Sequence, residues 1–130
     1  IFFLDRWYGF DDAIYTSARL LEVLSRKDDP QAVFDGLPKV ENTPEIRIEC
    51  ADRIKFRAVE LFTEYARGIY DDCVDIDGVR FTRGDTWGLV RPSNTQPVIV
   101  LRFEARNKTD LDRIERETRN RLDAIIRGLT

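Results

Sequence analysis

The sequence predicts an α+β fold: an antiparallel four-stranded sheet with two helices packed on one face, preceded by the helical remnant of another domain. Three observations support this prediction. Short apolar strands alternate with tight turns, two segments at 52–67 and 109–129 have apolar residues at helical spacing, and a proline- and glycine-rich stretch at 27–44 separates them from an earlier helix. We therefore expect residues 1–40 to be the tail of a preceding domain plus a linker, and residues 41–130 to form a domain of their own.

The first part contains one clear helix. Apolar residues recur there at helical spacing up to about residue 26, and either Asp11 or Asp12 can cap the start. Residues that interrupt helices dominate the stretch that follows: Pro30, Gly36, Pro38 and Pro44. This stretch is the expected boundary between the two parts.

The second part begins with a strand and a helix. In the segment 45–50, Ile46 and Ile48 alternate with charged residues, which predicts a half-buried strand. Asp52 can then cap a helix that continues to the residue before Gly68. Because the helix follows the strand directly in the chain, we expect it to pack on one face of the sheet.

Further strands and a last helix complete the predicted domain. Asp77-Gly78 between apolar residues is a strong signal for a tight turn, and strands are expected at 86–91 and 98–105. Thr109 can cap the last helix. Opposite charges lie at i,i+4 along the outside of that helix, which indicates a solvated face.

The composition excludes several chemistries. The chain has 130 residues, 21 Lys and Arg against 24 Asp and Glu, and no histidine, which excludes Ser-His-Asp triads and histidine metal sites. The net charge of −3 argues against a nucleic-acid binder. No apolar run is long enough for a membrane helix, and the opening IFFLDRWYGF lacks the basic start of a signal peptide. We therefore expect neither nucleic acid nor a membrane as a partner.

Two residue types bear on the origin of the chain. Cys50 and Cys73 are the only cysteines, and without a second pair of cysteines a structural zinc site is not expected. We expect instead that both are buried thiols of a cytoplasmic protein. Methionine is absent, even at position 1. We therefore expect a piece of a longer protein.

The segment Trp87–Pro97 contains the most informative residues. Residues 86–103 include no Asp or Glu, and Arg91 and Arg102 are the only charged side chains among them. This acidic protein is therefore expected to keep one locally positive patch here.

The residues of this segment offer many hydrogen-bond donors. Ser93 to Gln96 are four successive polar residues, and their backbone N–H groups can form an anion-binding nest. Arg91 adds a planar fork that binds two oxygens at once, and Pro92 and Pro97 stiffen both ends of the loop. These features suit a phosphate or another oxyanion. A plain polar turn between two strands explains the same residue types, and the residues alone leave both interpretations open.

These motifs resemble the C-terminal, fourth domain of the α-D-phosphohexomutases, above all in the bacterial phosphomannomutase/phosphoglucomutase branch. The matching residues are DGVR at 77–80, Trp87–Pro97 and the strand VIVLRFEA at 98–105. The opening IFFLDRWYGFDDAIY is similar to the strand and helix that follow the sugar-binding loop of the family's third domain. The resemblance covers nearly the whole chain.

The resemblance implies an isomerase that interconverts 1-phospho and 6-phospho hexoses. In this family a phosphoserine of the first domain donates its phosphoryl group, a bisphosphorylated intermediate reorients, and the second domain holds Mg²⁺. The implied partners are glucose or mannose 1-phosphate and 6-phosphate, and the remaining mutase domains. This chain has no catalytic residue and no metal ligand of the family, so alone it is expected to be inactive and to bind phosphosugar weakly.

The family's site residues carry over position by position. The expected contacts to the substrate phosphate are Arg91, Ser93, Asn94 and Thr95. Secondary candidates are Gln96 and Arg102. The interdomain hinge corresponds to Glu41–Pro44, and Thr43 and Pro44 are the expected hinge residues. Many relatives have Gly at position 94 and Glu at position 96. Asn94 agrees with the phosphomannomutase/phosphoglucomutase branch, and Gln96 removes a negative charge beside the site.

A non-enzymatic binding module is the alternative. A sheet that binds nucleic acid needs aromatic residues interleaved with basic ones, which no strand of this chain has. A protein-interaction fragment has some support from the first 26 residues, because their aromatic side chains lack a sheet to cover: Phe2, Phe3, Trp7, Tyr8 and Phe10.

Overall fold

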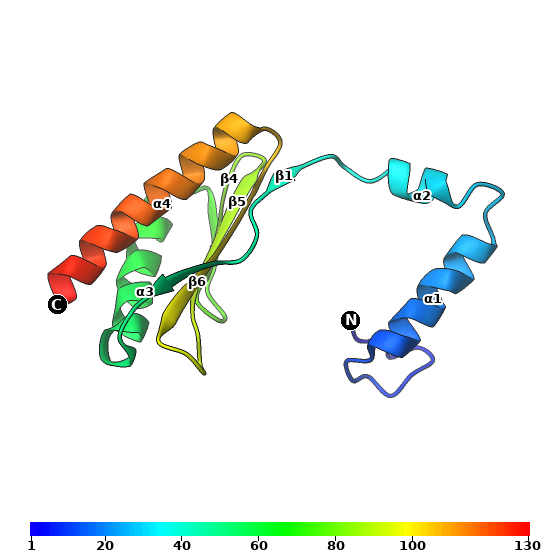
Figure 1. Ribbon diagram of the computed structural model, residues 1–130, viewed down its shortest axis with the longest axis horizontal. Helices are drawn as coiled ribbons and strands as arrows, with labels where there is room; N and C mark the ends of the chain where they lie inside the picture. Colours follow the sequence, from blue (N-terminus) through cyan, green and yellow to red (C-terminus); the bar gives the residue numbers. More distant parts are fainter. The chain divides into compact units, whose positions relative to one another are not determined.

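The computed structural model describes all 130 residues as two compact units, Ile1–Pro38 and Lys39–Thr130. Figure 1 shows the helices and strands of each unit. The division falls inside the stretch at 27–44 that the prolines and the glycine interrupt.

The first unit consists of two helices after an irregular N-terminal segment. Helix α1 spans Ala13–Ser25 and helix α2 spans Gln31–Asp35. Asp12, one of the two expected caps, accepts the Tyr15 N–H at 2.9 Å. Helix α1 has no buried residue, and large apolar side chains of the unit are exposed: Ile1, Phe2, Leu4, Tyr8 and Ile14. This unit therefore has no substantial core of its own.

The second unit is built on one antiparallel sheet of six strands, not the four expected. The strands are β1 (Glu41–Asn42), β2 (Ile46–Glu49), β3 (Asp72–Val74), β4 (Val79–Arg83), β5 (Thr86–Pro92) and β6 (Val98–Ala105). Their order is β1-β6-β5-β4-β3, and β2 pairs with β6 beside β1. The two additional strands, β1 and β3, have only two and three residues. Segments this short carry too few apolar residues to show an alternating pattern.

Two helices, α3 (Asp52–Arg67) and α4 (Lys108–Leu129), cover one face of this sheet (Figure 1). Between the layers lies a core in which Phe62 of α3 meets Phe81 and Phe103 of the sheet and Leu122 of α4. Gly88 of β5 leaves room for the two sheet rings, since a Cβ there would lie 2.5 Å from Cζ of Phe81. The α+β class and the one-sided helix layer are therefore confirmed.

The two helices of the second unit begin differently from the sequence prediction. Ala51, not Asp52, is the N-cap of α3, and Asp52 is the first helical residue. Asn107, not Thr109, caps α4 by accepting the Asp110 N–H at 2.9 Å. Asn107 accepts the amide three residues later, as an N-cap side chain does, so the helix begins earlier than predicted with its first turn capped.

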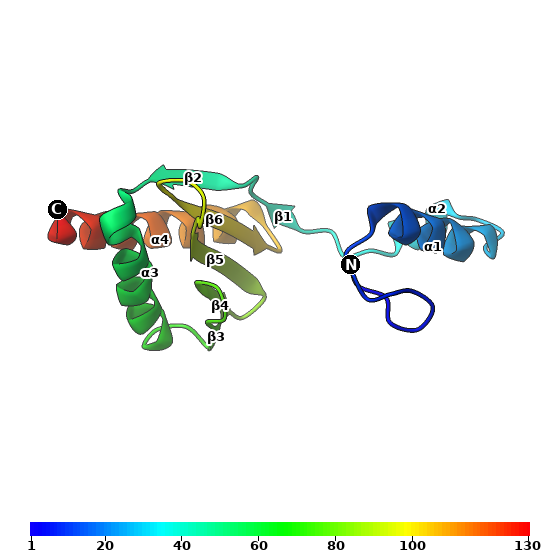
Figure 2. The same ribbon diagram turned by 90° about the horizontal axis from the view of Figure 1, so that it is seen from below.

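The opposite face of the sheet has no helix over it (Figure 2). Side chains alternate along each strand, so Arg91 of β5 shares this open face with Val100 of β6, its partner in the register. Arg102 and Arg80 flank Leu89 on the same face. The open face is therefore rich in arginine, and the loop between β5 and β6 begins at one end of it.

Candidate phosphate-binding site

The loop between β5 and β6 is closed at its base by backbone hydrogen bonds. The Ser93 N–H donates to the Val98 carbonyl at 3.0 Å. The Cys50 N–H, at the end of β2, donates to the Pro97 carbonyl at 2.9 Å. With proline at both ends of the loop, these bonds leave the backbone little freedom.

Ser93 also organises the inside of the loop. Its Oγ accepts the Gln96 N–H at 3.1 Å and the Thr95 N–H at 3.3 Å. The expected nest of four free backbone N–H groups therefore does not form, because three of the four amides already have partners. The Asn94 N–H remains unpaired, as do the side chains of Asn94 and Thr95, and the Ser93 hydroxyl keeps its own proton free to donate.

Arg91 is the second-to-last residue of β5, next to the loop, and its guanidinium has an ion-pair partner. Its Nη1 lies 3.1 Å from Oδ2 of Asp77, in a pair whose side chains are 46% and 55% exposed. The absence of carboxylates from residues 86–103 predicted a locally positive patch, but it did not foresee an acidic partner for Arg91 from another segment. Asp77 is outside that window and reaches Arg91 from the turn between β3 and β4.

Gly78 places this turn directly against β5. Its φ is +78°, and a Cβ at this position would lie 2.3 Å from the Val90 carbonyl oxygen and 2.6 Å from Cα of Arg91. Only glycine adopts this conformation and permits this approach without strain. The Asp77-Gly78 motif therefore forms the expected tight turn and also sets the position of Asp77 beside Arg91.

The two secondary candidates have different surroundings. Arg102 is exposed on the open face, opposite Leu89, and has no ion-pair partner. Gln96 is an anchor inside the loop: its side-chain oxygen accepts from Nη1 of Arg47 at 2.9 Å, and its carbonyl accepts from Nζ of Lys55 at 2.8 Å. Arg102 is therefore available to a ligand, and Gln96 is held by its two oxygens while its side-chain NH₂ group remains free to donate.

Sequence reasoning missed Arg47 and Lys55. One signal was present for Lys55, because it lies on the apolar side of α3, one turn before Ala58 and Val59, where a charged residue needs a partner. The partner lies 41 residues away in the chain, so local patterns did not reveal it.

The residues expected at the hinge lie at the edge of the sheet. Thr43 is buried, its N–H donates to the Phe103 carbonyl at 3.0 Å, and its Oγ1 accepts the Phe103 N–H at 3.1 Å. The chain is thus already attached to β6 at Thr43, and the assignment of Thr43 and Pro44 to a hinge stays a prediction.

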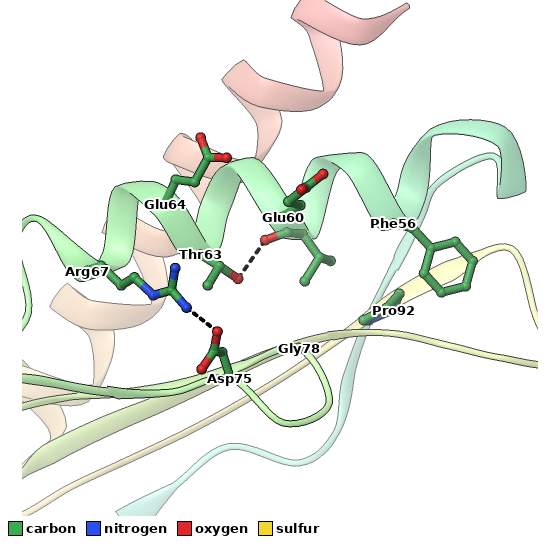
Figure 3. A pocket seen from close by; sticks show the side chains of 9 residues that line it. Phe56, Glu60, Thr63, Glu64, Arg67, Asp75, Gly78 and Pro92 are labelled. Carbon is green, nitrogen blue, oxygen red and sulfur yellow. Dashed lines mark hydrogen bonds and ion pairs between the residues drawn. The ribbon is translucent and has the colours of Figure 1, made fainter.

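A pocket lies elsewhere in this unit (Figure 3). It has a volume of about 360 Å³ and lies between α3 and the segment Asp75–Gly78. Glu60, Glu64 and Asp75 line it, with Arg67 paired to Asp75. Three carboxylates against one guanidinium disfavour an anion, so this pocket does not suit a phosphate.

Three further observations concern a buried thiol, the grouping of metal-ligating side chains and the character of the helices. Burial raises the pKa of the Cys50 thiol, which keeps it protonated and unreactive although it adjoins the loop. No three His, Cys, Asp or Glu side chains are grouped so that they could hold a metal ion. None of the helices has the length and apolar character that crossing a membrane requires.

Comparison with known proteins places this geometry in a family. The family described as "Phosphoglucomutase/phosphomannomutase, C-terminal domain" matches residues 45–121. The phosphomannomutase/phosphoglucomutase of Pseudomonas aeruginosa is 45% identical over 126 residues, which is 96% of this chain and 27% of that protein. The phosphoglucomutase of Neisseria gonorrhoeae is 41% identical over 97% of this chain, again 27% of the relative.

A solved structure agrees with the sequence matches. The crystal structure of a phosphoglucomutase/phosphomannomutase family protein from Burkholderia thailandensis superposes with a TM-score of 0.78 at 44% identity, over 95% of this chain and 26% of that one. This chain spans about a quarter of the length of these relatives. The match over residues 45–121 includes the whole Ser93–Gln96 loop and every strand from β2 to β6. The chain therefore belongs to the phosphoglucomutase/phosphomannomutase family and contains its C-terminal domain.

Proposed function

We propose that the second unit binds the phosphate group of a hexose phosphate, as one part of a phosphohexomutase that interconverts 1-phospho and 6-phospho hexoses. The observation that carries this proposal is the loop at 93–97. Its backbone is held by internal hydrogen bonds, while its unpaired donors and the Arg91 guanidinium remain at the exposed surface. A rigid set of donors loses little entropy when it binds an anion.

Each residue of the proposed site has a definite role. Arg91 binds two phosphate oxygens through its planar fork, and the Ser93 hydroxyl, the Asn94 N–H and the Thr95 hydroxyl donate to the others. Arg102 adds positive potential from the adjacent strand. These groups position the phosphate that does not react. No carboxylate accepts a hydrogen bond from the Ser93 or Thr95 hydroxyl to activate it as a nucleophile, so we assign phosphoryl transfer to the parts of the enzyme outside this chain.

We infer that Mg²⁺ is also bound by parts of the enzyme outside this chain. The carboxylates of this chain do not gather into a metal site. We therefore assign Mg²⁺, the phosphoserine and the choice between glucose and mannose to the remaining mutase domains, which are the partners of this one. Because Cys50 and Cys73 are free thiols, we place the enzyme in the reducing cytosol.

The proposal is tested by titration of glucose 1-phosphate and glucose 6-phosphate into the ¹⁵N-labelled chain. We expect amide shifts concentrated at Ser93–Thr95, with weak affinity, because one phosphate clamp supplies only part of the binding energy of a complete cleft. Unphosphorylated glucose is the control. Shifts of equal size with glucose, or shifts spread over the unit without a maximum at the loop, contradict the proposal.

The ion pair between Arg91 and Asp77 leads to a prediction of its own. We expect Asp77→Asn to tighten phosphate binding by about two- to fivefold, because exposed ion pairs contribute only about 0–1 kcal/mol and the carboxylate then no longer competes for the guanidinium. Calorimetric or NMR titration with glucose 6-phosphate measures this change.

Asp75→Asn is the matched control for that change. It removes the same charge from a residue two positions away in the same turn, where the carboxylate pairs with Arg67 instead. If Asp75→Asn strengthens binding as much as Asp77→Asn, the effect is one of net charge, and direct competition for Arg91 is refuted.

A further inference from the structure

Lys55 is the only charged residue buried in the structure, with 3% of its surface exposed. Its Nζ donates to Oδ1 of Asp52 at 2.6 Å and to the carbonyl of Gln96 at 2.8 Å. Removing an ammonium group from water costs free energy, and the partner carboxylate of Asp52 is 72% exposed, so this ion pair offsets little of that cost. The stability of the fold therefore does not by itself account for this lysine.

The carbonyl that Lys55 contacts belongs to Gln96, in the loop at 93–97 between β5 and β6, called the phosphate loop below. The same oxygen accepts the Val98 N–H at 2.8 Å, and the Gln96 N–H donates to Ser93 Oγ. On the outside of the loop, Nη1 of Arg47 donates to the side-chain oxygen of Gln96 at 2.9 Å. Gln96 is thus held through its amide, its carbonyl and its side chain, and two of the groups that hold it are cations from β2 and α3.

These contacts connect the loop to the rest of the unit. Ser93, Thr95 and Gln96 form one hydrogen-bonded turn, so a displacement of Gln96 also displaces the Ser93 hydroxyl and the Asn94 N–H. Lys55 and Arg47 come from two different elements, α3 and β2, and therefore fix the turn in more than one direction.

We propose that Lys55 and Arg47 are positioning residues of the phosphate loop, which act through Gln96 to hold Ser93–Thr95 in the geometry that binds phosphate. This inference rests on the proposed function, since it concerns the same loop. Neither residue touches the phosphate. Their effect is on preorganisation: without them the loop has to be ordered when the ligand binds, and affinity falls accordingly.

The first test compares three variants of the 130-residue chain in titrations with inorganic phosphate, followed at the Ser93–Thr95 amides. We expect Lys55→Met and Arg47→Met each to weaken binding by about fivefold or more, because the loop loses an anchor. Lys108→Met removes the same charge from an exposed ion pair at the start of α4 and should change binding less than about twofold. If Lys108→Met weakens binding as much as Lys55→Met, the loss of affinity comes from the change in net charge, and the proposal is overturned.

The second test asks whether the hydrogen bond to Gln96 forms in solution and whether loss of an anchor makes the loop more mobile. In the unmodified chain we expect a through-hydrogen-bond scalar coupling between ¹⁵Nζ of Lys55 and the ¹³C carbonyl of Gln96, and ¹⁵N relaxation of Asn94 and Thr95 typical of an ordered backbone. In Arg47→Met, whose changed side chain is exposed and leaves the core intact, the Asn94 and Thr95 amides should become more mobile. Absence of the coupling, or unchanged mobility and affinity in Arg47→Met, overturns the proposal even if Lys55→Met does not fold.

The outcomes separate this inference from the function on which it rests. If the unmodified chain shows no phosphate-dependent shifts at Ser93–Thr95, the proposed function fails. If the unmodified chain shows them and the Lys55→Met chain binds phosphate equally well, the function stands and the role of Lys55 fails.

Discussion

Replacing Arg91 with alanine should reduce the affinity of the chain for glucose 6-phosphate by more than about tenfold, because charge-assisted, bidentate hydrogen bonds to an anion are the strongest single contacts available at this surface. The fold should remain unchanged. The Arg91 side chain is 46% exposed, and its ion pair with Asp77 is of the exposed kind that contributes about 0–1 kcal/mol to stability.

The measurement is an NMR titration, with Arg106→Ala as the control. Arg106 is also exposed and also ion-paired, to Asp85, but it follows the far end of β6, away from the loop. Arg91→Lys separates charge from shape: it keeps the charge and loses the planar fork, so we expect an affinity between those of the unmodified chain and Arg91→Ala. Unchanged binding in Arg91→Ala would remove the central residue of the proposed site.

Replacing Gly78 with alanine should destabilise the second unit by about 2–3 kcal/mol, since the substitution combines a left-handed φ with a steric clash. The added Cβ would meet the Val90 carbonyl oxygen at 2.3 Å and Cα of Arg91 at 2.6 Å. Because both contacts are to the backbone of β5, neither is relieved by a change of rotamer. Arg91 should move as well, so phosphate affinity should fall together with stability.

Gly84→Ala provides the matched control for this prediction. Gly84 also has a positive φ, +57°, but its Cβ would meet nothing within 4 Å. We expect it to cost only about 1 kcal/mol, the penalty of the backbone conformation alone. Urea unfolding, followed through amide resonances of residues Lys39–Thr130, measures both costs. Equal costs for the two variants would show that the close approach of the turn to β5 contributes nothing.

Local sequence patterns predicted most of the helices and long strands correctly. The helix expected from Asp52 to about Arg67 is α3, and the strand expected at 98–105 is β6. These elements are long enough for several repeats of their apolar period, which is the strongest signal a sequence contains. The prediction of four strands was wrong because β1 and β3 are held in the sheet by their neighbours and not by a pattern of their own.

The candidate site was predicted less completely than the fold. The composition of the loop, its proline-bracketed ends and the resemblance to a known family pointed to Arg91 and Ser93–Thr95. The same reasoning placed Gln96 among the secondary ligand contacts but did not foresee that its backbone N–H and its two oxygens bond to Ser93, Lys55 and Arg47. A residue type states which bonds a side chain is able to make, and its neighbours decide which of them it makes.

By itself the sequence determined the helices α3 and α4, the long strands, the Asp77-Gly78 turn and the family to which the loop is similar, because each of these depends on residues close together in the chain. Only the tertiary structure decided the electrostatics of the loop. Asp77 meets Arg91 across 14 residues, and Lys55 meets Gln96 across 41. Such contacts arise when strands pair and a helix packs on them, so the charge that a guanidinium or a carbonyl encounters is a property of the assembled sheet and not of the segment in which it lies.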